Sequence, residues 1–278
     1  MKNLLKKSYL PLCVIAILFS NQLMGQKSVE LLYNMKQGEQ FTFNIKTSQD
    51  ISMEMQGQSM VIKQGIELVQ DVLVASVQEN KHFTLDFTYK KIKFNQNAMG
   101  MDVTWDSENP EANANPMVQQ IAQSMNKIIG SKVSSELDQY GNPVKNIASE
   151  VMAENQAVSG FESGMLNVFP DHKVKVGDTW QVEVKPEKQS DFLVKSVYKL
   201  EEVKGKVATI SFEGVVTGTE AKGQPAKISG TISGKTQVTI ATGWIISASV
   251  NQAINMEMEN EGMKMPIKMN SYIEMTSK

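Results

Sequence analysis

Long alternations of apolar and polar residues run through this chain, and they constrain its fold more than any other feature. The odd positions of 41–55 form a mostly apolar stripe, and the even positions of 60–74 form a second one. Because successive side chains of a strand point to opposite faces, such stripes predict strands with one apolar face. Stripes of about fifteen residues would span ~50 Å, far beyond the usual strand. Strands of that length coil or break at bulges, and a change of apolar parity predicts a bulge near Lys90 and Lys91.

Similar stripes return near the end of the chain, at 228–240, 244–258 and 263–275. Between the two groups, residues 117–129 show the periodicity of an amphipathic helix, which Gly130 would end. We therefore predict a mainly β (α+β) fold of long curved antiparallel strands in two related halves that resemble a half-barrel. A sheet with one apolar face needs cover, so central helices, this one and another within 148–169, are expected to pack on the concave face.

Two β-hairpins of nearly the same sequence lie within these stripes, at 51–62 and 254–269. Each places an Ile-x-Met-Glu-Met run before a polar turn, predicted to have four residues, at 56–59 and 259–262. The predicted facing pairs are Met55 with Met60, Met53 with Ile62, Met258 with Met263, and Met256 with Met265. Each hairpin would then have one sulfur-rich apolar face. The candidate ligand-binding residues are the methionines of these hairpins: Met53, Met55, Met60, Met256, Met258, Met263, Met265 and Met269.

Three interpretations of this methionine-rich face stay open. It is an ordinary hydrophobic face filled by an adaptable side chain, the lining of a cavity for an apolar or lipid-like ligand, or a Cu(I) site built from soft sulfur. The lack of supporting histidine or cysteine ligands counts against copper, so we predict no metal site. Our hypothesis is that the two hairpins lie close together and line one apolar cavity under the central helix.

The chain also shows signs of an internal duplication. Gly-Asp-Thr-Trp at 177–180 corresponds to Gly-Glu-Gln-Phe at 38–41, and the strand-turn-strand block at 198–212 corresponds to 72–87. With the Val-x-Val-Gly-Asp-Thr-Trp motif at 174–180, these blocks make the chain resemble a family of uncharacterised exported proteins of Bacteroidota, a domain of unknown function. The resemblance implies location and architecture, and it provides no site residues. In shape, the long strands are also similar to those of periplasmic lipoprotein carriers.

The N-terminus has the features of an export signal. Lysines precede an apolar stretch at 10–19, and Gly25 offers a small residue for cleavage. The only cysteine, Cys13, lies in this segment, so the mature chain is expected to have no disulfide or thiol site. The expected organisation is a signal peptide at 1–25, a first β half at 26–106, a connector of helices and a hairpin at 107–169, and a second β half at 170–278, with 26–278 as one structural domain. We expect a periplasmic or secreted protein without a membrane span after signal removal.

No catalytic constellation is visible in the sequence. His82 and His172 lie in expected loops, without metal-binding spacing, and no Gly-x-Ser-x-Gly elbow occurs. Every basic residue is lysine, which makes nucleic acid a poor partner. We therefore expect a non-enzymatic exported protein without a cofactor, which binds or carries an apolar or lipid-like ligand. The alternative is a structural or adaptor component of the cell envelope that acts through protein–protein contacts, with a partner that the sequence does not identify.

Overall fold

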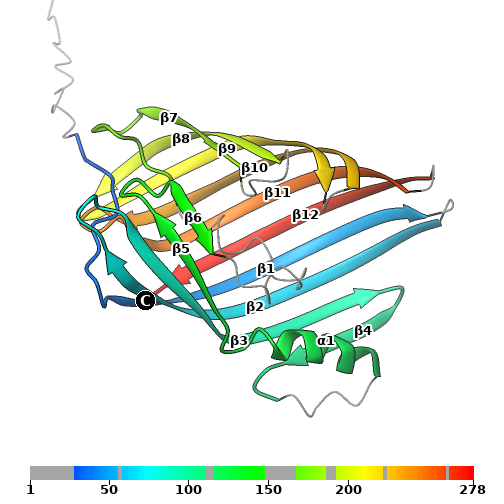
Figure 1. Cartoon of the computed structure of the whole chain (residues 1–278). Coiled ribbons are helices and arrows are strands. Elements are labelled where there is room, and N and C mark those ends of the chain that lie inside the picture. Colours follow the sequence, from blue (N-terminus) through cyan, green and yellow to red (C-terminus); the bar gives the residue numbers. More distant parts are fainter. Residues whose placement is uncertain are drawn as a thin grey trace, which may run out of the picture.

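One curled antiparallel sheet of twelve strands contains both groups of predicted stripes (Figure 1). The computed structural model describes residues 28–55, 58–109, 116–147, 167–185, 192–221, 224–260 and 263–278. The order across the sheet is β6-β5-β3-β2-β1-β12-β11-β10-β9-β8-β7. The remaining strand, β4, pairs with β3 and is not part of this order. The strands are β1 (Gln40–Met55), β2 (Gln58–Val77), β3 (Phe83–Ala98), β4 (Met101–Asp106), β5 (Lys132–Leu137), β6 (Pro143–Ile147), β7 (Thr179–Val184), β8 (Leu193–Lys204), β9 (Val207–Ala221), β10 (Gln224–Thr239), β11 (Ile245–Asn260) and β12 (Met263–Ser277).

The long stripes form long strands, as predicted. β1 has 16 residues and β2 has 20, and they coil together across the molecule (Figure 1). The predicted bulge is confirmed: Val69 pairs with Lys91 and Gln70 pairs with Tyr89, which leaves Lys90 as the extra residue of β3. The mainly β prediction is therefore confirmed.

The first and last strands pair with each other near the middle of the sheet. β1 and β12 run antiparallel from the Phe43–Ser277 pair to the Met53–Ile267 pair. This pairing joins the strands of the two predicted halves into one continuous sheet, so no sheet edge remains between them.

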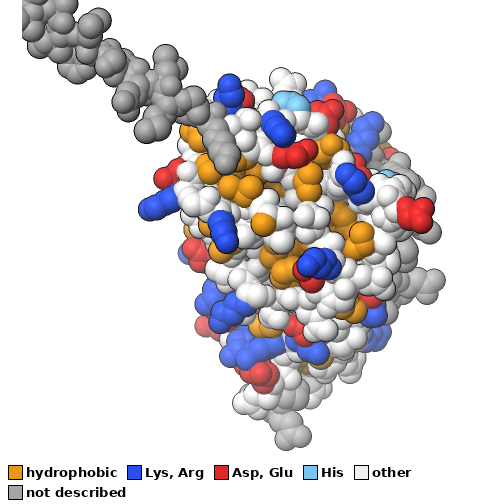
Figure 2. All heavy atoms as spheres, turned by 90° about the vertical axis from the view of Figure 1, so that its left-hand side faces the viewer, with side chains coloured by type: hydrophobic (Ala, Val, Ile, Leu, Met, Phe, Trp, Pro, Cys, Tyr) orange, Lys and Arg blue, Asp and Glu red, His pale blue; other side chains and the backbone are white. Residues whose placement is uncertain are grey.

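The core lies on one face of the sheet, which we call the inner face. It is lined by the odd positions of β1 and the even positions of β2, with Phe43, Ile45 and Leu68 at most 2% exposed. Inner-facing residues of β8 to β10 and of β5 belong to the same cluster, so the curled sheet covers much of its own inner face. Polar and charged side chains occupy the opposite, outer face. Figure 2 shows one end of the molecule, where hydrophobic side chains are scattered among interspersed lysines and carboxylates.

The predicted position of the helix is wrong. α1 (Pro116–Asn126) packs mainly against β4, beside the β3 side of the sheet, and does not lie over the centre (Figure 1). The described side chains of its apolar stripe are buried or partly buried, with Val118 and Met125 at 4% and 2% exposed. The curled sheet and β5 already cover the middle of the inner face, so no helix is needed there. The second predicted helix cannot be compared, since 148–166 lie outside the described residues, and residues 167–169 are not helical.

The two related blocks have the same hydrogen bonds. Gly38 N–H donates to Val74 O at 2.9 Å and Gly177 N–H donates to Leu200 O at 2.7 Å, and both glycines have positive φ. In the opposite direction, Val74 N–H donates to Glu39 O, and Leu200 N–H donates to Asp178 O. The register between β2 and β3 shifts directly after Val74, and the register between β8 and β9 shifts directly after Leu200. These matches support the internal duplication.

Both methionine hairpins have tighter turns than the four residues predicted. Met55 pairs with Gln58, and Asn260 pairs with Met263, so only two residues separate the paired strands at each tip. Met60 is therefore opposite Met53, and Met265 is opposite Met258. The predicted facing pairs are therefore wrong by two positions. A shift of two keeps every side chain on its face, because the side-chain period of a strand is two. The predicted signal peptide at 1–25 lies outside the described residues, and no described helix is long and apolar enough to span a membrane.

Candidate functional site

The β1–β12 pairing places the two methionine hairpins side by side. One row across the inner face reads Met60, Met53, Ile267, Met256 and Ile228, on β2, β1, β12, β11 and β10. The next row, toward the middle of the strands, contains Ile62, Ile51, Met269 and Ile254, on β2, β1, β12 and β11. The hairpins are thus neighbours with their apolar residues on one face, as hypothesised. In the described part of the chain α1 packs mainly against β4 and not over these hairpins, so the hypothesised cover by the helix is wrong.

The methionines with described side chains in these hairpins are only partly buried. Met256, Met258 and Met269 pack against a cluster of Val216, Ala226, Ile228 and Ile254, which is separate from the main core. Met53, Met60 and Met265 are also partly buried. The side chains of Met55 and Met263 lie outside the described part, although their backbones belong to β1 and β12. We call the inner-facing residues of these two rows, together with Met258, Met265, Ala226 and Val216, the methionine patch.

A polar row crosses the inner face between the main core and the methionine patch. It consists of Gln96, Gln64, Gln49, Ser271 and Gln252, which are cross-strand partners on β3, β2, β1, β12 and β11. The four glutamines are partly buried and Ser271 is 5% exposed. Five polar side chains therefore lie in line across a face that is otherwise largely apolar.

Sequence reasoning missed this polar row, although the repeat carries a signal for it. The run Gln-Asp-Ile-Ser-Met-Glu-Met at 49–55 matches Gln-Ala-Ile-Asn-Met-Glu-Met at 252–258. The repeated motif thus extends back to the glutamine, and β12 holds the two copies in the same register. The alternation pattern predicts the face of each glutamine, but the pairing of β1 with β12 is needed to align them.

The inner face carries no formal charge over its central strands. In the described residues of β1, β2, β10, β11 and β12, every lysine, aspartate and glutamate occupies an outer-facing position. Tyr198 on the inner face of β8 stays neutral as well, because burial raises its pKa to about 12. A charged group placed on this face would meet no countercharge from these five strands.

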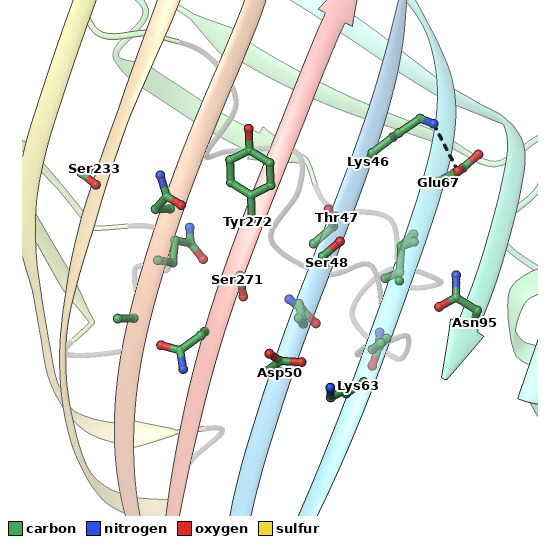
Figure 3. A pocket seen from close by; sticks show the side chains of 18 of the residues that line it. Lys46, Thr47, Ser48, Asp50, Lys63, Glu67, Asn95, Ser233, Ser271 and Tyr272 are labelled. Atoms are coloured by element: carbon green, nitrogen blue, oxygen red, sulfur yellow. Dashed lines mark ion pairs between the residues drawn. The ribbon is translucent and has the colours of Figure 1, made fainter. Parts of the chain in front are cut away.

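Two hydroxyls at the polar row lack a hydrogen-bond partner among the described residues. Thr47 is 3% exposed and Ser271 is 5% exposed, yet neither Thr47 Oγ1 nor Ser271 Oγ is hydrogen-bonded. The two residues lie on neighbouring strands, since Ser271 pairs with Gln49, two positions from Thr47 (Figure 3). Buried hydroxyls usually have a partner, so these two mark a place where hydrogen-bonding capacity is unused.

A hollow of about 690 Å³ lies against the same strands. Most residues that line it face outward, but the lining also includes Thr47 and four members of the polar row, Gln49, Gln64, Gln252 and Ser271 (Figure 3). Most of the residues that line the hollow are polar or charged, and they include the ion pair of Lys46 and Glu67, with 3.3 Å between Nζ and Oε1. Tyr272 projects there and donates a hydrogen bond to Glu274 at 2.9 Å, which raises the pKa of the phenol. The methionines with described side chains do not line this hollow. The hollow is therefore distinct from the methionine patch, although it borders the polar row.

Each histidine lies beside a carboxylate in the described structure. His82 lies 3.5 Å from Glu136, and His172 lies 3.0 Å from the neighbouring Asp171. Neither histidine is on the inner face of a strand. Within the described ranges, no three His, Cys, Asp or Glu side chains are close enough to hold a metal ion.

Solved structures show a similar fold. One is lipovitellin, in a study titled for lipid–protein interactions, with a TM-score of 0.50 and 7% sequence identity. That match covers 88% of this chain but only 25% of the lipovitellin chain. The translocator domain of autotransporter NalP from Neisseria meningitidis matches at 8% identity over 87% of this chain and 89% of that domain, with a TM-score of only 0.26.

Sequence comparison identifies the family. No curated protein matches the chain. Residues 80–151 and 149–245 both match one family, and together they span more than half of the 278 residues. The matched region includes the helix and the strands β7 to β10, and it ends before the second methionine hairpin. The chain therefore belongs to the DUF6263 family, a family of unknown function.

Proposed function

We propose that this protein binds an apolar, lipid-like molecule at the methionine patch and acts by holding it, without catalysing a reaction. The observation that carries the proposal is the patch itself: methionines from two distant hairpins lie together on one uncharged face and remain only partly buried. Methionine is flexible and polarizable, which suits a surface whose contents change. Export to the periplasm or the outside, as the N-terminal segment predicts, is part of the proposal.

The likeness to lipovitellin is consistent with this proposal at the level of fold alone. A large curled antiparallel sheet provides a broad inner face, and lipovitellin is a protein studied for its interactions with lipid. The sequences share only 7% identity, so the ligand itself must be determined for this chain.

Binding of the uncharged dye N-phenyl-1-naphthylamine tests the proposal. We expect saturable fluorescence enhancement with the purified protein. Met256→Asp should weaken binding by at least about tenfold, because it places a charge on an apolar face. Asn255→Asp is the matched control, since it adds the same charge to the outer face of the same strand.

The proposal is wrong if the dye does not bind, or if both aspartate variants bind it as well as the original protein does. Far-ultraviolet circular dichroism of each variant would show that the sheet is retained. Organic extraction of natively purified protein, followed by mass spectrometry, would then identify the natural ligand.

A further inference from the structure

We propose that the ligand of the methionine patch is an uncharged amphiphile. Its hydrocarbon chain lies over the patch, and its neutral polar group, a hydroxyl, ester or amide, is hydrogen-bonded by the polar row. This inference rests on the function proposed above and assigns a class of ligand and a direction of binding to it.

The first support is the distribution of charge. All charged residues of β1, β2, β10, β11 and β12 in the described part lie on the outer face. An ionised head group moved from water to the inner face would lose its hydration and meet no countercharge there. A neutral head group has a much smaller desolvation cost. The face therefore selects against fatty acids in their charged form and against cationic amphiphiles.

The second support is the unused hydrogen-bonding capacity of the row and of Thr47 beside it. Thr47 Oγ1 and Ser271 Oγ are buried without a partner in the described structure, beside the partly buried Gln49. A hydroxyl can donate one hydrogen bond and accept others, and a glutamine amide can do both. Such a set can satisfy a neutral group that donates, accepts, or does both.

The third support is the change of packing along β1. Ile45 and Thr47, on the core side of the row, are 1% and 3% exposed, whereas Ile51 and Met53, beyond it, are only partly buried. Space for a ligand chain is therefore on the side of the hairpin tips. From Gln49 to Met53 the strand rises ~13 Å at ~3.3 Å per residue, which sets the scale of the chain that fits. The polar group accordingly lies at the row and the hydrocarbon chain points toward the tips.

Competition with N-phenyl-1-naphthylamine tests the inference with three probes that share a ten-carbon chain: 1-decanol, decanoate and decyltrimethylammonium. At pH 8 we expect 1-decanol to displace the dye at a concentration about tenfold below that of either ion. The double variant Gln49→Leu with Ser271→Ala should lose about tenfold in affinity for 1-decanol, since it removes two hydrogen-bonding groups. Dye affinity should change little, because the dye depends on the patch.

Ser48→Ala with Asn270→Leu is the matched control, since these are the outer-facing neighbours on the same two strands, and it should bind 1-decanol unchanged. The inference is overturned if decanoate or the ammonium compound competes as well as 1-decanol. It is also overturned if the row variant binds 1-decanol unchanged while the dye still binds. If the dye itself fails to bind the original protein, the proposed function falls and this inference falls with it.

Discussion

Gln70 is the residue whose chemistry is least compatible with its surroundings. It is 0% exposed between Phe43 on β1 and Tyr89 on β3, and neither its Oε1 nor its Nε2 has a hydrogen-bond partner in the described part of the chain. An unsatisfied buried polar group costs about 1–3 kcal/mol, and methionine has nearly the same shape. We expect Gln70→Met to raise the free energy of unfolding by that amount in urea denaturation.

The exposed Gln181→Met on β7 is the control for this substitution and should stay within about 0.5 kcal/mol of the original protein. Destabilisation by Gln70→Met would mean that the amide is satisfied in solution, and the prediction would then be wrong.

At the scale of elements, α1 depends on its contact with β4. Met125 is 2% exposed on the buried side of the helix, whereas Gln119 is exposed. Met125→Asp should lower the free energy of unfolding by several kcal/mol, because it buries an unpaired charge. Gln119→Asp adds the same charge to the exposed side and should have little effect.

Thermal unfolding followed by circular dichroism measures both helix variants. Equal melting temperatures would show that α1 is not packed on β4 in solution.

The strands themselves could be predicted from the sequence, because alternation reports which face each side chain occupies. The bulge at Lys90 could be predicted for the same reason, since an extra residue changes parity. The turn lengths could not be predicted, because polar residues such as Gln58 and Glu259 are equally compatible with a turn and with the end of a strand. The polar row could not be predicted either, since alternation does not specify which strands become neighbours.

At the scale of the whole molecule, the single sheet predicts one cooperative unfolding transition. Ile210 on β9 is 0% exposed in the main core, which also contains Trp105 on β4. Ile210→Ala should cost about 2–5 kcal/mol. If the sheet unfolds as one unit, fluorescence of Trp105 should report the full loss, although Trp105 lies in the other half of the chain.

A chain with Trp180 and Trp244 replaced by phenylalanine isolates the Trp105 signal. In that background, Val215→Ala is the control, because Val215 lies on the same strand and is 52% exposed. A Trp105 midpoint that does not move with Ile210→Ala would show that the two halves unfold separately.

The pairing of β1 with β12 also determines the order in which the sheet can assemble. Hairpins such as β1–β2 and β11–β12 join segments that are close in sequence, whereas the Phe43–Ser277 pair joins the two most distant strands. Closing such a large loop is slow relative to forming a hairpin. Until β12 is available, β1 presents an open edge to other chains. We therefore expect the β1–β12 pairing to form after the two hairpins that it joins.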